Sequence, residues 1–279
     1  MSRKELSCLP VSHYPDMNEG KLAIPQWSKE AQVIGFDRYD LGEGSIAFQT
    51  LEELKKIRED CVLPLHMLSI YTDFTNSDAD IRKKEVVLAQ EKIRKTAALG
   101  GKYIRMPGGP AYPEAVEHEA DAIEWMTECF NACIPVAKEC GVRIVFENDS
   151  QPPSWKVPNF GFDVKRFVKT WESLKQLDIG FNFDTGNAFF LEDWKTILGT
   201  VIDRIETVHI TDYDYRPGEL NMTIFGQGTV PIEEMLVMIR DHGFSGKVIT
   251  MEDTTFQGLK GTVSSYRYTR SVCDRVFGK

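Results

Sequence analysis

The stretch FNFDTGNAFF, residues 181–190, is apolar at both ends and holds Asp184, Thr185, Gly186 and Asn187 in its middle. A short apolar run of this kind predicts a buried strand. Asp184 would then stand where the strand ends and the chain turns. Two interpretations are open at this point: Asp184 caps the helix that follows, or a group bound in a pocket requires its charge.

Seven further short apolar runs are spread along the chain, and amphipathic stretches fall between them. In chain order the eight runs are KELSCLP, FDRYDLG, LPLHMLSI, GGKYIRM, VRIVFEN, IGFNFD, ETVHIT and KVITMED. Strands that alternate with helices predict a parallel sheet, and eight such units predict closure into a (β/α)8 TIM barrel of the α/β class. A doubly wound open sheet is the alternative, but no G-x-G-x-x-G motif follows the first run.

Helix signals support this alternation. Thr50 and Glu53 fit a capping box at the start of a helix, and Asp163 is expected to cap a later one. Glycines such as Gly141 and Gly243 stand where helices are expected to end. The chain has 279 residues, close to the roughly 250 of a typical barrel. We therefore predict one barrel domain over residues 1–279.

Composition narrows the class of protein. The formal net charge of −9 disfavours nucleic acid and anionic membranes as partners, because both are negatively charged. No run of about 20 apolar residues predicts a membrane span. None of the six cysteines forms a C-x-x-C pair, so reduced thiols and a cytoplasmic location are expected. A small molecule is the expected partner, and a homo-oligomer is compatible with the sequence.

The carboxyl ends of the last four predicted strands carry Glu147, Asp184, His209 and Glu252. In a TIM barrel these ends meet at the active-site face. Three carboxylates in one half-buried site repel each other, and a divalent cation would relieve the repulsion. Three oxygen donors and one imidazole suit Mn²⁺ best among the candidates, with Mg²⁺, Co²⁺ or Zn²⁺ as alternatives. Taken singly, each residue would pass as a cap, a loop residue or a buried histidine.

Side-chain alternation along the strands offers a check on this cluster. If the four residues point into the barrel, then Asn182, Thr207 and Thr250 point inward as well. These small polar residues would supply hydrogen bonds below the charged layer.

Substrate contacts are expected from polar residues near the same strand ends. These candidates are Arg105, Asn148, Trp155, Lys156, Asn187, Asp212 and Arg216. Alternatives stay open for several of them. Arg105 would equally serve in a salt bridge inside the barrel, Trp155 and Lys156 would fit a surface loop, and Asp212 would fit a turn cap.

The motifs IVFEND, FNFDTGN, VHITD, FGQGTVP and ITMED resemble those of the xylose isomerase-like TIM barrel superfamily of sugar phosphate isomerases and epimerases. The resemblance covers nearly the whole chain. It implies metal ligands at Glu147, Asp184, His209 and Glu252, with Glu147 and Glu252 acting also as acid and base. It implies a substrate that is a ketose or related hydroxy-ketone, and an enediolate intermediate stabilised by the cation.

Three positions depart from the ketose 3-epimerases of this superfamily. Asn187 stands where many members have a histidine, Pro153 where those epimerases have a second glutamate, and Tyr215 where they have an arginine, with Arg216 adjacent. Close identity with a ketose 3-epimerase is therefore not expected.

The predicted function is a divalent-metal-dependent sugar isomerase or epimerase of carbohydrate metabolism. The alternative is a metal-dependent dehydratase of the inosose dehydratase type acting on a keto-polyol. A nuclease resembling endonuclease IV is disfavoured, because that chemistry needs more histidines and a basic face. A barrel without catalysis, acting as a sugar sensor or a subunit, would not need both glutamates.

Overall fold

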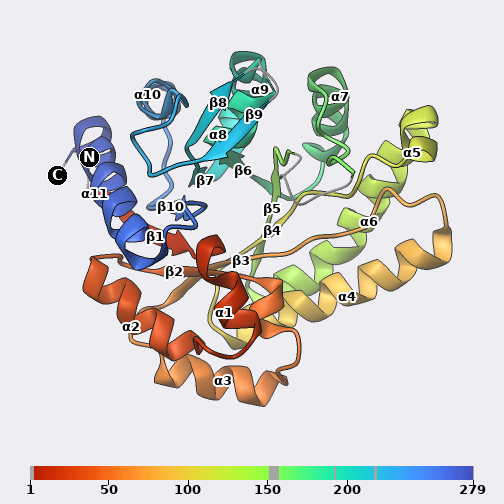
Figure 1. Cartoon of the computed structure of the whole chain (residues 1–279). Coiled ribbons are helices and arrows are strands. Elements are labelled where there is room, and N and C mark those ends of the chain that lie inside the picture. Colours follow the sequence, from red (N-terminus) through yellow and green to blue (C-terminus); the bar gives the residue numbers. More distant parts are fainter. Residues whose placement is uncertain (1–2, 151–156, 192, 217–218, 279) are drawn as a thin grey trace.

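The eight apolar runs form eight parallel strands in a nearly closed barrel in the computed structural model, with helices on the outside (Figure 1). The structure describes residues 3–150, 157–191, 193–216 and 219–278. The barrel strands are β1 (Glu5–Leu9), β2 (Tyr39–Gly42), β3 (Leu65–Ser69), β4 (Tyr103–Met106), β5 (Arg143–Glu147), β6 (Gly180–Asp184), β7 (Ile205–Ile210) and β10 (Val248–Glu252). The predicted (β/α)8 TIM barrel is confirmed.

The hydrogen-bonded order of the strands is β1-β10-β7-β6-β5-β4-β3-β2. The edge between β1 and β2 is joined by the amides of Asp37 and Arg38, which donate to the carbonyl of Leu6 at 2.8 and 3.1 Å. Because every strand runs in parallel, all the carboxyl ends open on one face.

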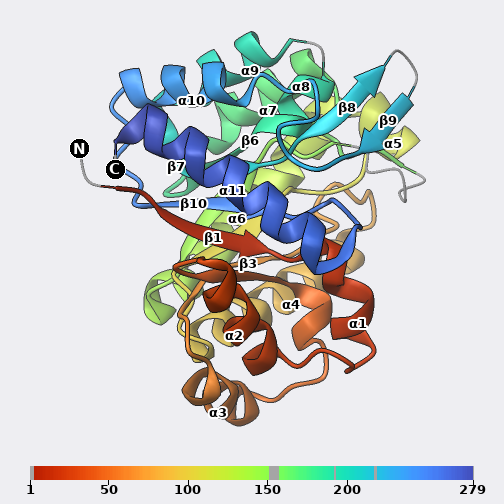
Figure 2. The same ribbon diagram turned by 60° about the vertical axis from the view of Figure 1, so that its left-hand side comes forward.

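The helices cover the outer surface of the sheet (Figures 1 and 2). They are α1 (Tyr14–Asn18), α2 (Ile24–Ile34), α3 (Leu51–Asp60), α4 (Ala79–Ala98), α5 (Pro113–Glu117), α6 (Glu119–Cys140), α7 (Val164–Leu174), α8 (Thr185–Phe190), α9 (Trp194–Val201), α10 (Ile232–Asp241) and α11 (Gly258–Phe277). Short 3₁₀ turns are η1 (Val11–His13), η2 (Glu43–Ile46) and η3 (Ile202–Arg204).

Local signals position these helices as expected. Thr50 and Glu53 form the predicted capping box at the start of α3, and the side chain of Asp163 accepts the amide of Arg166 at the start of α7. Gly141 ends α6 in a left-handed conformation with φ of 65°, which a residue with a side chain adopts only at a cost.

The main core lies between the strands and the helices. Phe146 of β5 stacks on Trp171 of α7 and meets Phe130 of α6 and Phe181 of β6 edge to face. Its neighbour Glu147 must then point the other way, into the barrel, because successive strand residues alternate. The aromatic core thereby fixes which side chains face the interior.

A small antiparallel hairpin, β8 (Tyr213–Arg216) paired with β9 (Glu219–Met222), interrupts the repeat between β7 and α10. This hairpin was not expected from the sequence. The segment lacks an apolar run, because the hairpin packs on the outside of the barrel near α8 (Figure 1) rather than in the sheet.

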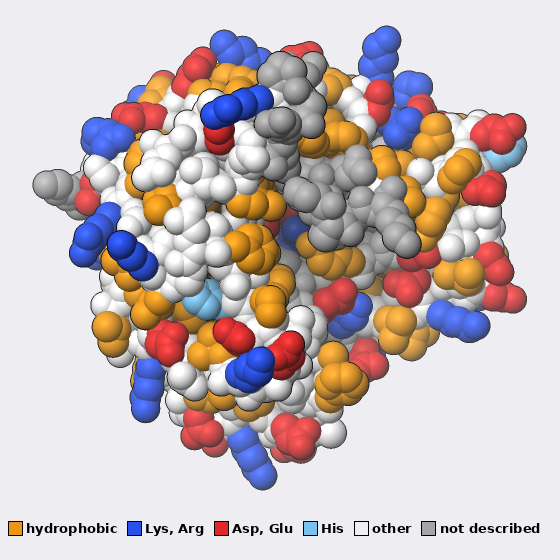
Figure 3. Space-filling model, in the orientation of Figure 1, with side chains coloured by type: hydrophobic (Ala, Val, Ile, Leu, Met, Phe, Trp, Pro, Cys, Tyr) orange, Lys and Arg blue, Asp and Glu red, His pale blue; other side chains and the backbone are white. Residues whose placement is uncertain are grey.

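No helix among the described residues is both long and apolar enough to cross a membrane. On the face shown in Figure 3, lysine and arginine side chains are dispersed among aspartate and glutamate side chains.

Candidate metal centre and active site

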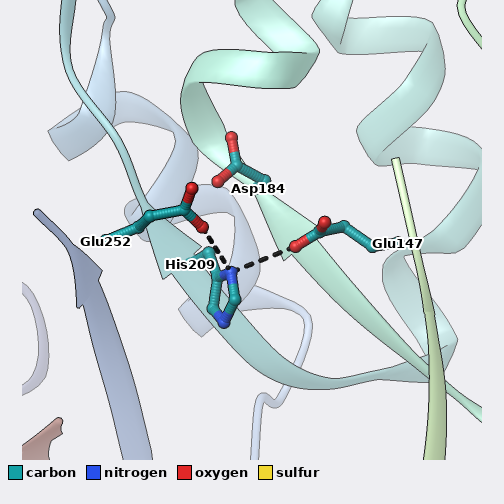
Figure 4. A group of neighbouring side chains, drawn as sticks. All are labelled: Glu147, Asp184, His209 and Glu252. Atoms are coloured by element: carbon teal, nitrogen blue, oxygen red, sulfur yellow. Dashed lines mark ion pairs between the residues drawn. The ribbon is translucent and has the colours of Figure 1, made fainter. Parts of the chain in front are cut away.

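Four side chains from four neighbouring strands converge at the carboxyl end of the barrel (Figure 4). Glu147, Asp184 and Glu252 are the last residues of β5, β6 and β10, and His209 lies one residue before the end of β7. The strand register pairs Asp184 with His209, and His209 with Thr250, two residues before Glu252. One donor atom from each of the four lies within 4.8 Å of the other three.

The imidazole of His209 stands between two glutamates, which approach it from opposite sides (Figure 4). Its Nδ1 lies 3.1 Å from Glu147 Oε1 and 3.0 Å from Glu252 Oε2. Burial alone would lower the pKa of His209, but these two adjacent carboxylates outweigh burial and raise the pKa to about 10. The ring is wholly buried, and its Nδ1 is the atom on which the two glutamates converge.

The two carboxylate oxygens of Asp184 have different surroundings, which resolves the question raised by the stretch at residues 181–190. Oδ1 accepts the amide of Asn187 at 2.6 Å and the hydroxyl of Thr211 at 2.7 Å, so it caps α8. Oδ2 is buried and has no hydrogen-bond partner in the described part of the chain. Burial, with the negative charges of Glu252 and Glu147, raises the pKa of Asp184 well above its ordinary value.

These observations fit a divalent cation. An orphaned buried carboxylate oxygen costs free energy unless a charge partner is supplied. Three hard oxygen donors and one nitrogen are a donor set that Mn²⁺, Mg²⁺, Co²⁺ or Zn²⁺ accepts. Glu147, Asp184, His209 and Glu252 would hold the ion.

Glu147 is oriented by a chain of buried polar groups. Asn182 Nδ2 donates to Glu147 Oε1 at 2.5 Å, and Thr207 Oγ1 donates to Asn182 Oδ1 at 2.7 Å. The predicted inward hydrogen bonds of Asn182 and Thr207 are confirmed. Thr250 also points inward, but it donates to Asp40 of β2 at 2.8 Å.

Arg105 of β4 forms the salt bridge inside the barrel, with its Nε 2.6 Å from Glu147 Oε2. Burial alone would raise the pKa of Glu147, but the neighbouring Arg105 and His209 outweigh burial and lower the pKa below its ordinary value. Glu147 is therefore held as a carboxylate. The guanidinium also lies 5.1 Å from the ring centroid of Tyr71.

A cavity of about 430 Å³ opens beside Tyr71, between the ends of β3 and β4. Its lining is mostly apolar and aromatic and consists of Tyr71, Thr72, Pro107, Gly109, Pro110, Tyr112, Val157 and Asn159. A cavity of this size, next to a cluster of charged groups, has the character of a small-molecule site.

Two of the predicted substrate residues make hydrogen bonds that shape the mouth. The side chain of Asn148 donates to the carbonyl of Asp184 at 2.8 Å and accepts its amide at 2.9 Å, which extends the pairing of β5 and β6. Asn187 is buried, and its Oδ1 accepts the hydroxyl of Ser150 at 2.6 Å. Substrate contact by either residue stays a prediction.

Asp212 binds the glycine-rich loop FGQGTVP. Its carboxylate accepts the amides of Gly226 at 2.7 Å, Gly228 at 3.1 Å and Val230 at 3.4 Å. A Cβ atom at position 228 would lie 2.0 Å from Asp212 Oδ1, so glycine is required there. The turn-capping interpretation of Asp212 is the one the hydrogen bonds favour.

The remaining predicted substrate residues lie further from the centre. Arg216 lies on β8, where its side chain is largely exposed and pairs with Asp214 at 3.0 Å. Trp155 and Lys156 lie outside the described residues.

Two buried carboxylates at this end were missed by the sequence analysis. Asp149, two residues after Glu147, has one oxygen without a hydrogen-bond partner among the residues described. Burial and the charge of Glu147 outweigh the nearby Arg105 and raise the pKa of Asp149 to about 7. Asp40 of β2 is wholly buried. A signal existed for both, since Asp149 follows a predicted strand directly and Asp40 is a carboxylate inside the otherwise largely apolar run of β2.

A sequence model of the xylose isomerase-like TIM barrel family matches residues 27–271 of this chain. No curated protein sequence matches it. Solved structures with the same fold include 3-keto-D-glucoside 4-epimerase from E. coli, with 15% identity, a TM-score of 0.73 and coverage of 96% of this chain and 100% of the other.

Two further structures are similar over almost their whole length. A D-psicose 3-epimerase from Clostridium cellulolyticum H10 shares 14% identity, with a TM-score of 0.71 and coverage of 98% of both chains. The IOLI protein, solved with a bound zinc atom, shares 13% identity, with a TM-score of 0.73 and coverage of 99% of this chain and 100% of the other. At these identities the likeness concerns the fold.

Proposed function

Because this chain belongs to the xylose isomerase-like TIM barrel family, we propose that it is a divalent-metal-dependent sugar isomerase or epimerase acting on a ketose or related hydroxy-ketone. The observation that carries the proposal is the four-residue cluster at the barrel mouth, with the orphaned Oδ2 of Asp184 buried inside it. The zinc atom named for the IOLI structure and the epimerase activities named for the other two support the same class.

We propose that Glu147 and Glu252 move the proton. They approach the centre from opposite sides (Figure 4), so one can remove a proton from the carbon next to the carbonyl and the other can return one to the opposite face. Arg105 keeps Glu147 ionised and therefore able to accept a proton. Asn182 holds the Glu147 carboxylate in a fixed orientation.

A bound divalent cation would supply the positive charge that stabilises the enediolate formed when the proton leaves. Manganese is our first choice of ion. The cavity beside Tyr71 would receive the carbons that do not react, and Arg105, Asn148, Asn187, Asp212 and Arg216, with Trp155 and Lys156, remain the proposed contacts for substrate hydroxyls. We propose a small-molecule sugar or polyol as the partner, and a cytoplasmic setting.

Proton NMR in D₂O tests this function. Mn²⁺-loaded protein is incubated with a panel of ketoses, keto-inositols and hydroxy-keto acids, the ion is then chelated, and the C–H signals are read. We expect metal-dependent loss of one C–H signal next to a carbonyl. Protein chelated before incubation is the control.

The position of the lost signal separates the possible reactions. Exchange with inversion at one carbon identifies an epimerase, and transfer between neighbouring carbons identifies an isomerase. A new alkene or deoxy signal would overturn the proposal in favour of a dehydratase. Absence of exchange across the whole panel would also overturn it.

A further inference from the structure

Asp40 is a buried carboxylate under the metal cluster to which the proposed reaction gives no role. Its Oδ1 accepts the hydroxyl of Ser7 at 2.6 Å and the amide of Met67 at 3.3 Å, and its Oδ2 accepts the hydroxyl of Thr250 at 2.8 Å. The donors come from β1, β3 and β10. All are neutral groups, and no lysine or arginine of the described chain forms an ion pair with this carboxylate.

A wholly buried carboxylate is costly when only neutral donors surround it. The buried His66 feels the charge of Asp40, but burial lowers the pKa of His66 to about 4. Among the described residues, the ion-pair contact of Asp40 is with His209, whose Nε2 lies 3.9 Å from Asp40 Oδ2. That distance is too long for a hydrogen bond, and a movement of about 1 Å would make it one. Asp40 therefore faces the metal cluster through the imidazole rather than directly.

The two nitrogens of His209 have different surroundings. Nδ1 faces Glu147 and Glu252, so it is the nitrogen placed to bind a cation. A nitrogen that binds a cation carries no proton, so the proton of the neutral ring must lie on Nε2. Nε2 is buried and lacks a hydrogen-bond partner within the described residues, and Asp40 is the anion opposite it.

We propose that Asp40 is a positioning residue that keeps the proton of His209 on Nε2 and thereby presents Nδ1 to the cation. A carboxylate on the outer nitrogen of a ligand histidine fixes the tautomer and ring orientation and raises the basicity of the ligand nitrogen. Hydroxyls of Ser7 and Thr250 in turn fix the carboxylate of Asp40. This inference rests on the metal centre of the proposed function and does not depend on the sugar.

The test is the binding of Zn²⁺ alone, without substrate, to the Asp40→Asn variant. We expect calorimetric titration of metal-free protein to show an affinity about 10- to 100-fold lower than that of the natural sequence. Zinc is diamagnetic, so ¹H–¹⁵N correlation of histidine-labelled, zinc-loaded protein reads the tautomer directly. The natural protein should show a proton on Nε2 of His209, and the variant should lose or shift that signal. Assignment comes from the spectrum of His209→Gln.

Ser7→Ala is the matched control, because it removes a hydrogen bond from Oδ1 of Asp40 and leaves Oδ2 facing His209. We expect its zinc affinity to stay within about threefold of the natural value and its imidazole signals to be unchanged. Thr250→Val removes the donor to Oδ2 with little change of shape. It should weaken zinc binding by about 3- to 10-fold, and it serves as the test if Asp40→Asn does not fold.

Two outcomes overturn the inference. One is zinc affinity within about threefold of the natural value, with an unchanged His209 signal, in Asp40→Asn or in its substitute Thr250→Val. The other is an equal loss of affinity in Ser7→Ala, because Asp40 would then act only by tying strands together. If the natural protein itself binds no zinc, the metal centre of the proposed function fails as well, which distinguishes the two failures.

Discussion

Strands β5 and β7 carry charged residues at both of their ends, and the two ends of the barrel use charge in opposite ways. At the amino end, Arg143 of β5 pairs with Glu206 of β7 at 2.7 Å and with Asp178 at 2.6 Å, and these side chains are partly exposed. At the carboxyl end, Glu147 and His209 of the same two strands are buried with Asp184 and Glu252. The amino end balances opposite charges in contact with water, whereas the carboxyl end gathers an excess of carboxylates away from water around Arg105 and His209.

The difference separates a structural cluster from a functional one. Exposed pairs contribute little stability and are screened by salt. Buried like charges destabilise the fold unless something binds them, so their presence needs a reason outside the fold. We therefore expect changes at the amino end to alter stability slightly and activity not at all. Changes at the carboxyl end should alter activity strongly, and removal of a buried charge there should stabilise the metal-free protein.

The largest expected effect is on turnover. Glu147→Gln and Glu252→Gln should each lower the rate of C–H exchange by about 10²- to 10⁴-fold, because each variant lacks one proton-transfer group. The measurement is the initial exchange rate in D₂O for the substrate found in the panel, with the melting temperature recorded to show that the fold survives.

Glu206→Gln is the matched control for these two variants, since it is the same substitution at the opposite end of the barrel. Its exchange rate should stay within about twofold of the natural protein. A rate within about tenfold of natural for either Glu147→Gln or Glu252→Gln would contradict the two-base proposal.

The second expected effect is a substitution in the metal cluster that increases the free energy of unfolding of the metal-free protein. Asp184→Asn keeps an oxygen for the cap of α8 and removes a charge whose pKa is raised by burial and by Glu252 and Glu147. Since a raised carboxylate pKa means that ionisation opposes folding, metal-free Asp184→Asn should be more stable at pH 7, by about 1 to 4 kcal/mol. Chemical unfolding with and without Mn²⁺ measures this.

The same experiment tests the metal. At 100 times its dissociation constant, a bound ion stabilises the natural protein by about 2.7 kcal/mol, and Asp184→Asn should lose that gain. Asp212→Asn is the control, because the Asp212 carboxylate is satisfied by three amides. Asp212→Asn should lower the free energy of unfolding by about 1 to 3 kcal/mol. Destabilised metal-free Asp184→Asn would show that this end is not strained by its charges.

The strands and the four clustered side chains could be predicted because they rest on local signals. Each strand is a short apolar run, and Glu147, Asp184, His209 and Glu252 stand at the ends of consecutive strands. In a parallel barrel these strand ends lie on one face, so their proximity can be predicted without any measured distance. The inward hydrogen bonds of Asn182 and Thr207 followed from alternation alone.

The details of the mouth could not be read in the same way. Asn148 looks like a free polar residue in the sequence, but the fold binds its side chain to the backbone of Asp184. For Asp212 the sequence left a substrate contact and a turn cap open, and the loop amides that it binds are distant along the chain. Arg216 lies on a hairpin whose sequence contains no apolar run from which a strand could be predicted. The role that we propose for Asp40 depends on its approach to His209 across the barrel, which no local pattern in the sequence indicates. Such roles depend on which residues meet when the barrel closes, and a sequence pattern does not show these individual contacts.

The smallest expected effect tests the amino end. Asp178 receives Lys138 at 2.8 Å and Arg143 at 2.6 Å, and these hydrogen bonds lower its pKa to about 2. Since the folded-state pKa is depressed, the stability it contributes is present above about pH 4 and is lost as the pH falls toward 2. Asp178→Asn should therefore lower the free energy of unfolding by less than about 1 kcal/mol at pH 7 in low salt, and by less still in 1 M salt or at pH 3.

Urea unfolding under the three conditions measures the effect of Asp178→Asn, with Asp203→Asn, a change of an exposed residue near the same end, as control. A loss of several kcal/mol that salt does not reduce, or any loss of Mn²⁺ binding, would mean that the two ends of the barrel are coupled rather than independent.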